Sequence, residues 1–488
     1  MPSRSRAHTD RLHRTSALAG VLSLATLILS LALPSTASAQ HRVIEQTALA
    51  NVIGSAVADA LHPSDGATNS NAPPAIRTRD EARLRAEQLA RALTDRIVDQ
   101  RLQQLTATWR AGGEPGAEAL DALNTVEPRR LEDALSRPIH SFDAPRGRIT
   151  GQFMVAGRVA PFVAYVPDDY APNTAWPLHI DLHGGGGAPW KSCDSNWEQG
   201  QPAQHGVILV CPGESDAGWW MPHGEKTVLA ALEHFRTLYH IDDERVSVGG
   251  ASSGGFGTWH AATKFPWLWR AAIVRCAATP RDPETLNNLG EVPAFLIHGD
   301  QDHRISVVNS RRSYAILSDG GHPVDYIEVP EMGHRYGRRY NTQILEWLEP
   351  RRRVLDRKFE YRVVRRGESP ERLHWLKPTW PTHKVVGELV SGEIVRAGDA
   401  EDAVNVVDVQ ATTDLQGFTV LLEDALWNPA HPVVVRYNGT EVYRGMPLPT
   451  IGAVLDSWVD HSDPGLLATH EVVVTLPTTS MLSASLTP

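Results

Sequence analysis

Cysteine is scarce in this sequence. Its 488 residues include three cysteines, Cys193, Cys211 and Cys276. Their spacing matches no cysteine-based metal motif, so we expect no metal site built on them. Three cysteines allow one disulfide and leave one thiol, and the sequence alone does not select the pair.

A surplus of positive charge is also missing. The chain has 47 Lys and Arg against 57 Asp and Glu, a formal net charge of −10. This balance excludes a protein that binds nucleic acid through its overall charge. With 42% hydrophobic and 21% charged residues, the composition is that of an ordinary globular protein. The length suggests two or three domains.

Long apolar runs are absent except near the N-terminus. Residues 17–33 are almost wholly apolar, follow several arginines and precede the small-residue sequence Ala37-Ser38-Ala39. These features are typical of a secretory signal peptide, which would be cleaved before Gln40. We therefore expect a secreted or periplasmic protein without a stable membrane anchor. An uncleaved anchor is the weaker alternative, because the run is at the short end of a membrane-spanning helix.

The remaining pattern predicts an organisation in four parts. Residues 1–39 are the signal peptide, 40–145 a helical N-terminal region, 146–350 an α/β domain and 351–488 a β-rich C-terminal domain. The N-terminal region carries no chemical motif, and we interpret it as a helical prelude to the next domain. Its helical candidates are residues 43–61, 79–109 and 118–135.

From residue 147 onward, short apolar strands alternate with helical patterns, which predicts a mostly parallel sheet covered on both faces. The expected strands are 149–155 and 161–166, which form a hairpin, then 178–182, 206–210, 245–249, 271–275, 294–297 and 324–329. The expected helices include 224–239 and the segment that ends at residue 263.

Beyond the basic segment 351–366, which we interpret as a solvated edge or a linker, strands dominate. They are expected at residues 384–390, 393–396, 404–409, 418–422, 433–437 and 471–476. Asn438-Gly439 is a hairpin turn signal. The pattern predicts a small β-sandwich.

The strongest chemical motif is Gly250-x-Ser252-x-Gly254. It follows an apolar strand and precedes a helical pattern, which is the context of a nucleophile elbow. Glycines on both sides permit a tight turn that exposes the serine hydroxyl. Ser253 lacks this glycine frame, so we expect Ser252 to be the nucleophile and the Ser253 N–H to stabilise the oxyanion.

A second oxyanion donor is expected from the loop His183-Gly184-Gly185-Gly186-Gly187. This run follows an apolar strand upstream of Ser252, and glycine allows a backbone N–H to approach the reacting carbonyl closely. Gly185 is the first choice for this donor and Gly184 the second. We interpret His183 as structural.

A serine nucleophile needs a histidine base and a carboxylate that orients this base, in the chain order Ser, acid, His for this motif. Asp300 and Asp302 both follow an expected strand. His334 follows the last strand of the predicted α/β domain, where the base should lie. His322 precedes that strand within a Gly-Gly-His-Pro turn, which indicates a surface residue.

Residues 242–259 resemble the nucleophile segment of secreted esterases of the polyhydroxybutyrate-depolymerase and feruloyl-esterase type, and prolyl-oligopeptidase-like hydrolases share a similar segment. His298-Gly299-x-x-Asp302 resembles the acid loop of these families, and Gly333-His334 their histidine loop. The resemblance covers about residues 147–348 and implies an α/β-hydrolase fold with Asp302 as the acid. The sequence departs from the families at residues 303–306, where they usually show a proline-bearing turn.

These observations favour hydrolysis of carboxylic esters through an acyl-enzyme on Ser252, without cofactor or metal. The expected substrate is a small-molecule or polymer ester, with Trp219 and Trp220 as substrate-binding residues. Two alternatives stay open: a serine peptidase of the prolyl-oligopeptidase type, and a non-catalytic binding protein on a hydrolase scaffold. The oligomeric state is left open.

Overall fold

The computed structural model describes residues 128–129, 132, 144–213, 218–335, 337–364, 369–382, 385–461 and 463–477. The chain divides into two compact units, Met1–Ala134 and Leu135–Pro488, and the fold below is that of the second. The predicted signal peptide and the first two helical candidates lie outside the described residues. In the third candidate, the described residues 128, 129 and 132 are helical. Within these ranges, no helix is both long and apolar enough to cross a membrane.

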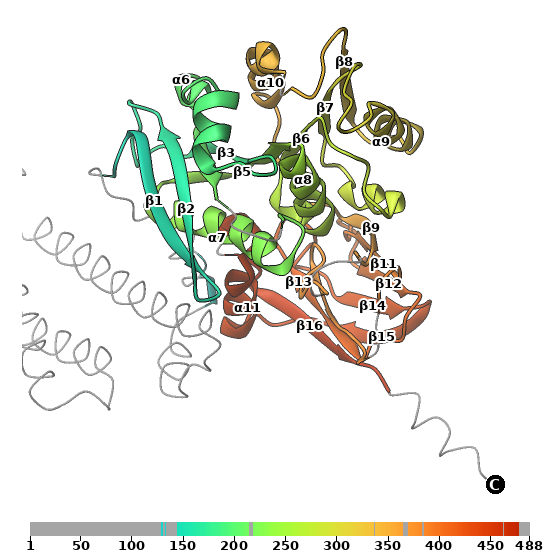
Figure 1. Cartoon of the computed structure of the whole chain (residues 1–488). Helices are drawn as coiled ribbons and strands as arrows, with labels where there is room; N and C mark the ends of the chain where they lie inside the picture. Colours follow the sequence, from blue (N-terminus) through green and yellow to red (C-terminus); the bar gives the residue numbers. More distant parts are fainter. Residues whose placement is uncertain are drawn as a thin grey trace, which may run out of the picture. The chain divides into compact units, whose positions relative to one another are not determined.

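One large sheet forms the centre of the predicted catalytic region (Figure 1), with the strand order β1-β2-β4-β3-β5-β6-β7-β8. β1 and β2 form the expected antiparallel hairpin, β2 is antiparallel to β4, and every later pairing is parallel. This topology confirms the predicted α/β-hydrolase fold. The strands are β1 (Gly147–Val155), β2 (Arg158–Val166), β3 (Trp176–Leu182), β4 (Ile208–Pro212), β5 (Ile241–Ala251), β6 (Ala271–Arg275), β7 (Ala294–Gly299) and β8 (Val324–Val329).

Helices cover both faces of this sheet. On β6, Ile273 belongs to a core cluster with α10, whereas Val274 belongs to the larger cluster that includes α7 and α8. Alternate strand residues therefore face opposite helical layers, which explains why every residue of β6 and β7 is buried. The helices are α6 (Gln201–Gln204), α7 (Pro222–Leu238), α8 (Ser253–Lys264), α9 (Val308–Asp319) and α10 (Asn341–Leu348), with short turns η1 (Lys191–Asn196), η2 (Pro266–Leu268), η3 (Pro283–Leu289) and η4 (Arg338–Tyr340).

The structure also selects the cysteine pair that the sequence left open. A disulfide joins Cys193 in η1 to Cys211 in β4, and Cys276 is a buried free cysteine. The disulfide fixes the η1 turn against the sheet within the cluster on the α10 face.

The C-terminal region contains two sheets, with the orders β10-β13-β16 and β15-β14-β12-β11-β9. The rings of Phe418 on β13 and Tyr437 on β14 are 5.7 Å apart, so the two sheets pack against each other. The elements are β9 (Lys358–Arg362), β10 (Leu376–Thr379), β11 (Leu389–Val395), β12 (Asn405–Ala411), β13 (Gly417–Leu422), β14 (Val433–Tyr437), β15 (Thr440–Gly445), α11 (Ile451–His461), η5 (Pro464–Leu466) and β16 (His470–Thr475).

Two predictions for this region are wrong in part. The segment expected to be a solvated edge or a linker contains β9, an edge strand whose alternate residues Phe359 and Tyr361 are buried. Glu360 lies between them and basic residues flank them, which hides the pattern. The expected strand at 384–390 starts only at Leu389 and continues to Val395, because residues 385–388 belong to a turn in which Glu388 N–H donates to Val385.

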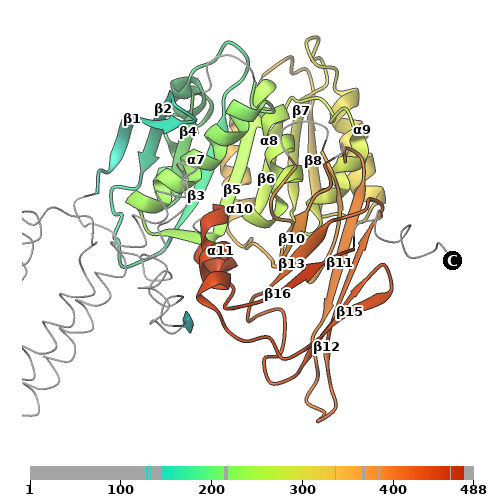
Figure 2. The same cartoon turned by 90° about the horizontal axis from the view of Figure 1, so that it is seen from below.

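The C-terminal strands lie along one side of the α/β sheet (Figure 2) and make specific contacts with it. Asn288 in η3 pairs with the Arg362 backbone: its side chain accepts the Arg362 N–H at 2.8 Å and donates to the Arg362 carbonyl at 2.9 Å. The Tyr361 hydroxyl donates to the Lys264 carbonyl at the end of α8. These contacts fix β9 beside the helix that follows Ser252.

Candidate active site

Ser252 lies at the sharp turn between β5 and α8, as the motif predicts. Its backbone has φ 57° and ψ −120°, a conformation that costs energy for any residue with a side chain. A Cβ on Gly250 would lie 2.6 Å from the backbone of Gly254, and a Cβ on Gly254 would overlap the carbonyl oxygen of Leu182. Both glycines are therefore needed for this turn.

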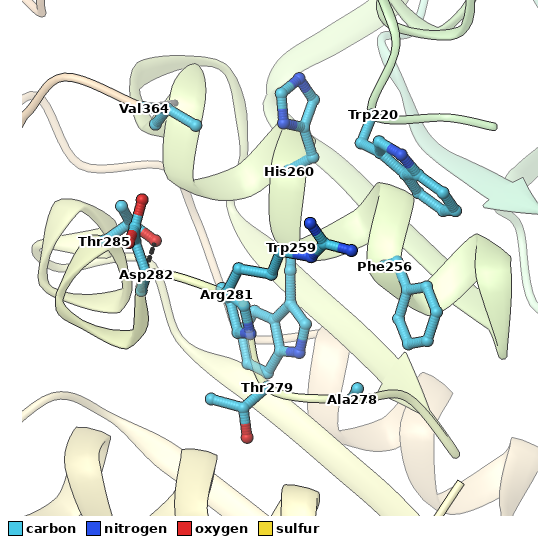
Figure 3. Close-up of a pocket in the computed structure, with 11 residues that line it drawn as sticks. Trp220, Phe256, Trp259, His260, Ala278, Thr279, Arg281, Asp282, Thr285 and Val364 are labelled. Carbon is cyan, nitrogen blue, oxygen red and sulfur yellow. Dashed lines mark hydrogen bonds between the residues drawn. The ribbon is translucent and has the colours of Figure 1, made fainter. Parts of the chain in front are cut away.

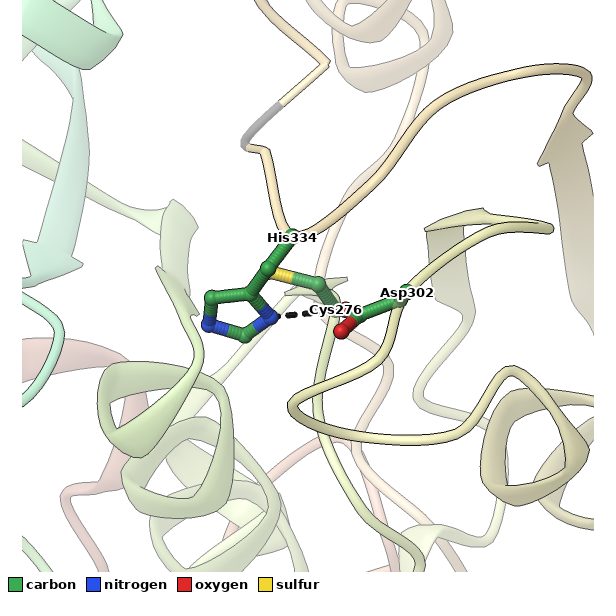
Figure 4. Close-up of side chains that lie close together, drawn as sticks. All are labelled: Cys276, Asp302 and His334. Carbon is green, nitrogen blue, oxygen red and sulfur yellow. Dashed lines mark hydrogen bonds and ion pairs between the residues drawn. The ribbon is translucent and has the colours of Figure 1, made fainter.

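The structure brings Ser252, His334 and Asp302 together in one hydrogen-bonded series. His334 Nε2 lies 3.0 Å from Ser252 Oγ, and His334 Nδ1 lies 2.6 Å from Asp302 Oδ2. Figure 4 shows the His334 ring directed at the Asp302 carboxylate. Because a carboxylate only accepts hydrogen bonds, Nδ1 carries the proton and Nε2 is free to accept the serine proton.

The electrostatic environment keeps Asp302 ionised. Its Oδ1 accepts the N–H groups of Arg304 and Ile305, both at 2.9 Å. Burial alone raises the pKa of Asp302, but the hydrogen bonds from Ile305, His334 and Arg304 outweigh burial and lower it. His298 Nε2 also lies 3.1 Å from Oδ2, which accounts for the histidine in the His298-Gly299-x-x-Asp302 sequence.

The two alternative candidates lie outside this series. Asp300 is exposed and lies in the turn between β7 and Asp302. The His322 ring hydrogen-bonds to the Gly290 carbonyl at 3.0 Å, at the opposite end of β8 from His334.

Backbone N–H groups of two segments meet beside Ser252. Ser253 is the first residue of α8, and a Cβ on Gly185 would lie 3.6 Å from Ser253 Oγ. Within the described residues, the N–H groups of Gly185 and Ser253 have no hydrogen-bond acceptor. Gly184 holds the loop instead: its carbonyl accepts the Gly187 N–H at 2.9 Å. Free donors at a helix N-terminus can bind an anion.

The prediction for Trp219 is wrong. Its side chain is 2% exposed, its indole N–H donates to the His183 carbonyl at 2.9 Å, and its ring packs against the His183 ring. The Trp219 side chain is therefore buried against the glycine loop, which it stabilises. The structural interpretation of His183 agrees with this packing.

Trp220, in contrast, lines a pocket of about 280 Å³ (Figure 3). Phe256 and Trp259 on α8 form further aromatic walls, and the Trp220 and Phe256 rings are 5.6 Å apart. Phe256 was not among the residues predicted from the sequence, although its position four residues after Ser252 in a predicted helix places both residues on one helix face. The remaining lining residues are His260, Ala278, Thr279, Pro280, Arg281, Asp282, Thr285 and Val364.

Cys276 lies next to the triad residues and could complete a metal-binding group in principle. Its sulfur, an Asp302 oxygen and a His334 nitrogen all lie within 4.8 Å of one another. Burial, however, raises the pKa of the Cys276 thiol to about 12, and a metal needs the thiolate. Asp302 and His334 are also already bonded to each other, so the group does not favour a metal.

The sheet topology, the elbow and the hydrogen-bonded side chains together define the class: the chain has the α/β-hydrolase fold and the side-chain arrangement of a serine hydrolase. No protein-family model matches it. A bifunctional acetylxylan esterase/xylanase of Neocallimastix patriciarum is 29% identical over 142 residues, 28% of this chain and 21% of that protein. The dipeptidyl-peptidase 5 of Aspergillus oryzae is 23% identical over 244 residues, 39% of this chain and 33% of that protein. The chain thus spans between a fifth and a third of the length of these relatives.

The solved structures that are similar to this chain also include both an esterase and a peptidase. A thermostable esterase is 25% identical with a TM-score of 0.38, over 42% of this chain and 63% of that chain. An acylaminoacyl peptidase of Pyrococcus horikoshii is 17% identical with a TM-score of 0.37, over 44% of each chain. Esterases and peptidases both occur among the proteins that this chain resembles.

Proposed function

We propose that this protein hydrolyses carboxylic esters through an acyl-enzyme on Ser252. The observation that carries the proposal is the series Asp302–His334–Ser252 beside two free backbone donors. His334 Nε2 takes the serine proton while Oγ attacks the ester carbonyl. The Ser253 and Gly185 N–H groups then donate to the negative oxygen of the tetrahedral intermediate.

Collapse of this intermediate breaks the ester bond, and the alcohol leaves with the proton from His334. A water molecule then gives a proton to His334 and attacks the acyl carbonyl, which releases the acid and restores the Ser252 hydroxyl. Asp302 stays ionised throughout and stabilises the imidazolium, in agreement with its lowered pKa. The aromatic pocket beside α8 supports an apolar acyl or alcohol group as the ligand.

We also propose that the protein is exported. The N-terminal sequence supports a cleaved signal peptide, and the Cys193–Cys211 disulfide is typical of proteins in oxidising compartments. Mass spectrometry of the secreted or periplasmic fraction would test this, with Gln40 as the expected first residue. A cell-retained chain that begins at Met1 would contradict it.

Exchange of Ser252 for alanine tests the ester hydrolysis. We expect Ser252→Ala to abolish turnover of 4-nitrophenyl acetate and butyrate. Ser253→Ala is the matched control, because Ser253 contributes its backbone N–H and its side chain has no hydrogen bond among the described residues. Undiminished turnover in Ser252→Ala would overturn the assignment.

A serine peptidase is the second candidate, favoured by the match to dipeptidyl-peptidase 5 over 244 residues. Aminoacyl 4-nitroanilides, assayed beside esters of the same acyl group, separate the two activities. Higher kcat/KM on the anilides would favour the peptidase. A third possibility, a non-catalytic binding protein, requires that a serine-reactive fluorophosphonate fails to label the chain.

A further inference from the structure

The aromatic pocket beside α8 contains a cation that the proposed hydrolysis does not use. Arg281 lines this pocket and is exposed. Within the described residues it forms no hydrogen bond or ion pair, although the chain has a net charge of −10. An arginine at an otherwise largely apolar pocket, without a carboxylate partner, is a candidate for binding an anionic ligand.

The acidic groups near this pocket are directed elsewhere. Figure 3 shows the Arg281 side chain extending toward the Phe256 side and away from Asp282, whose backbone carbonyl accepts the Thr285 hydroxyl at 2.7 Å. Glu225, behind the pocket, already bonds the His260 ring at 2.7 Å and the Lys264 ammonium at 2.6 Å. A carboxylate that enters the pocket would therefore meet the Arg281 guanidinium without competition from these groups.

The aromatic walls define the rest of the ligand. Trp220 and Phe256 pack together, and Trp259 is 3% exposed on the inner side of α8. Such walls favour a flat aromatic group by stacking and edge-to-face contacts. A guanidinium can hold a carboxylate with two parallel hydrogen bonds.

The pocket is also close to the reacting serine. The Phe256 N–H donates to the Ser252 carbonyl at 3.1 Å, so Phe256 lies one helical turn, about 5 Å along the axis, beyond it. Ala278 is two residues after Cys276, which lies next to His334. A group bound in this pocket can thus belong to an ester whose carbonyl is at Ser252.

We propose that this pocket binds an aryl group that carries a carboxylate, and that Arg281 pairs with this carboxylate. The substrate is then an ester with a carboxylated aromatic acyl or alcohol part. As a statement about the substrate, this inference rests on the proposed ester hydrolysis; as a statement about binding, it stands on the pocket alone.

A binding experiment tests the pocket independently of catalysis. Calorimetric titration of the full chain with benzoate and with benzamide compares two ligands of the same shape and different charge. We expect benzoate to bind at least 10-fold more tightly, the two ligands to bind about equally to Arg281→Gln, and Arg281→Lys to recover part of the difference. Arg396→Gln is the matched control and should behave like the wild type, because Arg396 is exposed after β11 in the C-terminal region and does not line the pocket. Equal binding of both ligands to the wild type, or a benzoate preference that persists in Arg281→Gln, would overturn the proposal.

Kinetics then connect the pocket to the reaction. Two substrate pairs distinguish the alcohol side from the acyl side: 4-acetoxybenzoate with 4-acetoxybenzamide, and 4-nitrophenyl hydrogen terephthalate with 4-nitrophenyl 4-carbamoylbenzoate. We expect one anionic member to have at least a 10-fold higher kcat/KM, mainly through KM, and to lose this advantage in Arg281→Gln. If the neutral esters are cleaved without any anion preference, the pocket inference fails. If benzoate binds as expected but no ester is cleaved, the proposed hydrolysis fails.

Discussion

At the scale of single residues, the turn at Ser252 depends on glycines whose surroundings leave no space for a side chain. Gly254 contacts the Leu182 carbonyl so closely that a single methyl group would overlap it. We expect Gly254→Ala to lower the free energy of unfolding by roughly 2–4 kcal/mol and to abolish hydrolysis, because the turn must open to accept the methyl group. Denaturant unfolding measures this loss. Gly398→Ala is the control, since its Cβ would meet no atom within 4 Å; an equal loss in both variants would contradict the argument.

Asp302 is the residue whose charge matters most for His334. Asp302→Asn keeps the size but removes the charge, and because Oδ1 accepts two backbone N–H groups, the amide NH2 takes the place of the Oδ2 that accepts the Nδ1 proton. We therefore expect kcat to fall roughly 10³–10⁴-fold with little change in KM. Steady-state kinetics on a 4-nitrophenyl ester measures this. The neighbouring Asp300→Asn should keep kcat within about twofold, because Asp300 is exposed. A loss of kcat in Asp300→Asn as large as that in Asp302→Asn would contradict the assignment of Asp302 as the acid that orients His334.

The triad could be predicted from the sequence, because the chain order of its members and the residues next to each member can be read directly from it. Ser252, Asp302 and His334 each follow a strand that the apolar pattern predicts. The difference between Trp219 and Trp220 could not be predicted in this way. They are adjacent and chemically identical, and only the hydrogen bond to the His183 carbonyl makes the first one structural.

At the scale of elements, the disulfide fixes η1 to β4 and thereby supports the α10 face of the sheet. Its cysteines are 18 residues apart, and a loop of this length corresponds to about 3 kcal/mol in the chain-entropy model. We expect Cys193→Ala combined with Cys211→Ala to lower Tm by several degrees while the activity at 25 °C persists. Calorimetry in the absence of reductant measures Tm. An unchanged Tm would mean that the disulfide does not form in solution.

Elements with a clear period were predicted from the sequence, whereas those stabilised by distant contacts were not. β8 was predicted to the residue, because β-branched and aromatic residues predominate in it and turn signals flank it. The segment that contains β9 was interpreted as a solvated edge or a linker, because the burial of Phe359 and Tyr361 depends on η3 and β11, which lie beside β9. The cysteine pairing was open for the same reason: it depends on where η1 meets the sheet.

At the scale of the whole molecule, a buried charge cluster joins the C-terminal region to the α/β region. Asp463, which is fully buried, binds Arg353 and also Arg236 on α7 at 2.8 Å. Burial alone raises the pKa of Asp463, but the two arginines outweigh burial and lower it well below its usual range. Asp463 is therefore ionised in the folded protein and compensates two buried cations.

We expect Asp463→Asn to lower the free energy of unfolding by roughly 3–5 kcal/mol near neutral pH, because Arg353 loses its carboxylate partner and Arg236 keeps only Asp243. Since the folded pKa is lowered, the contribution of Asp463 is complete above the ordinary aspartate pKa of about 4 and decreases as the pH falls below it. Denaturant titrations at several pH values should show the gap between wild type and variant closing on the acidic side. Glu441→Gln, in an exposed pair with Arg444, should cause no measurable change. A gap that widens toward acidic pH would contradict this sign.

Covalent labelling of Ser252 tests most directly whether the chain is a serine hydrolase. The intact wild-type protein should gain the mass of one phosphonyl group on reaction with a fluorophosphonate, and peptide mapping should locate that group on Ser252. Ser252→Ala should gain none. A label on Ser253, or an unlabelled wild-type protein that is folded by circular dichroism, would contradict the account.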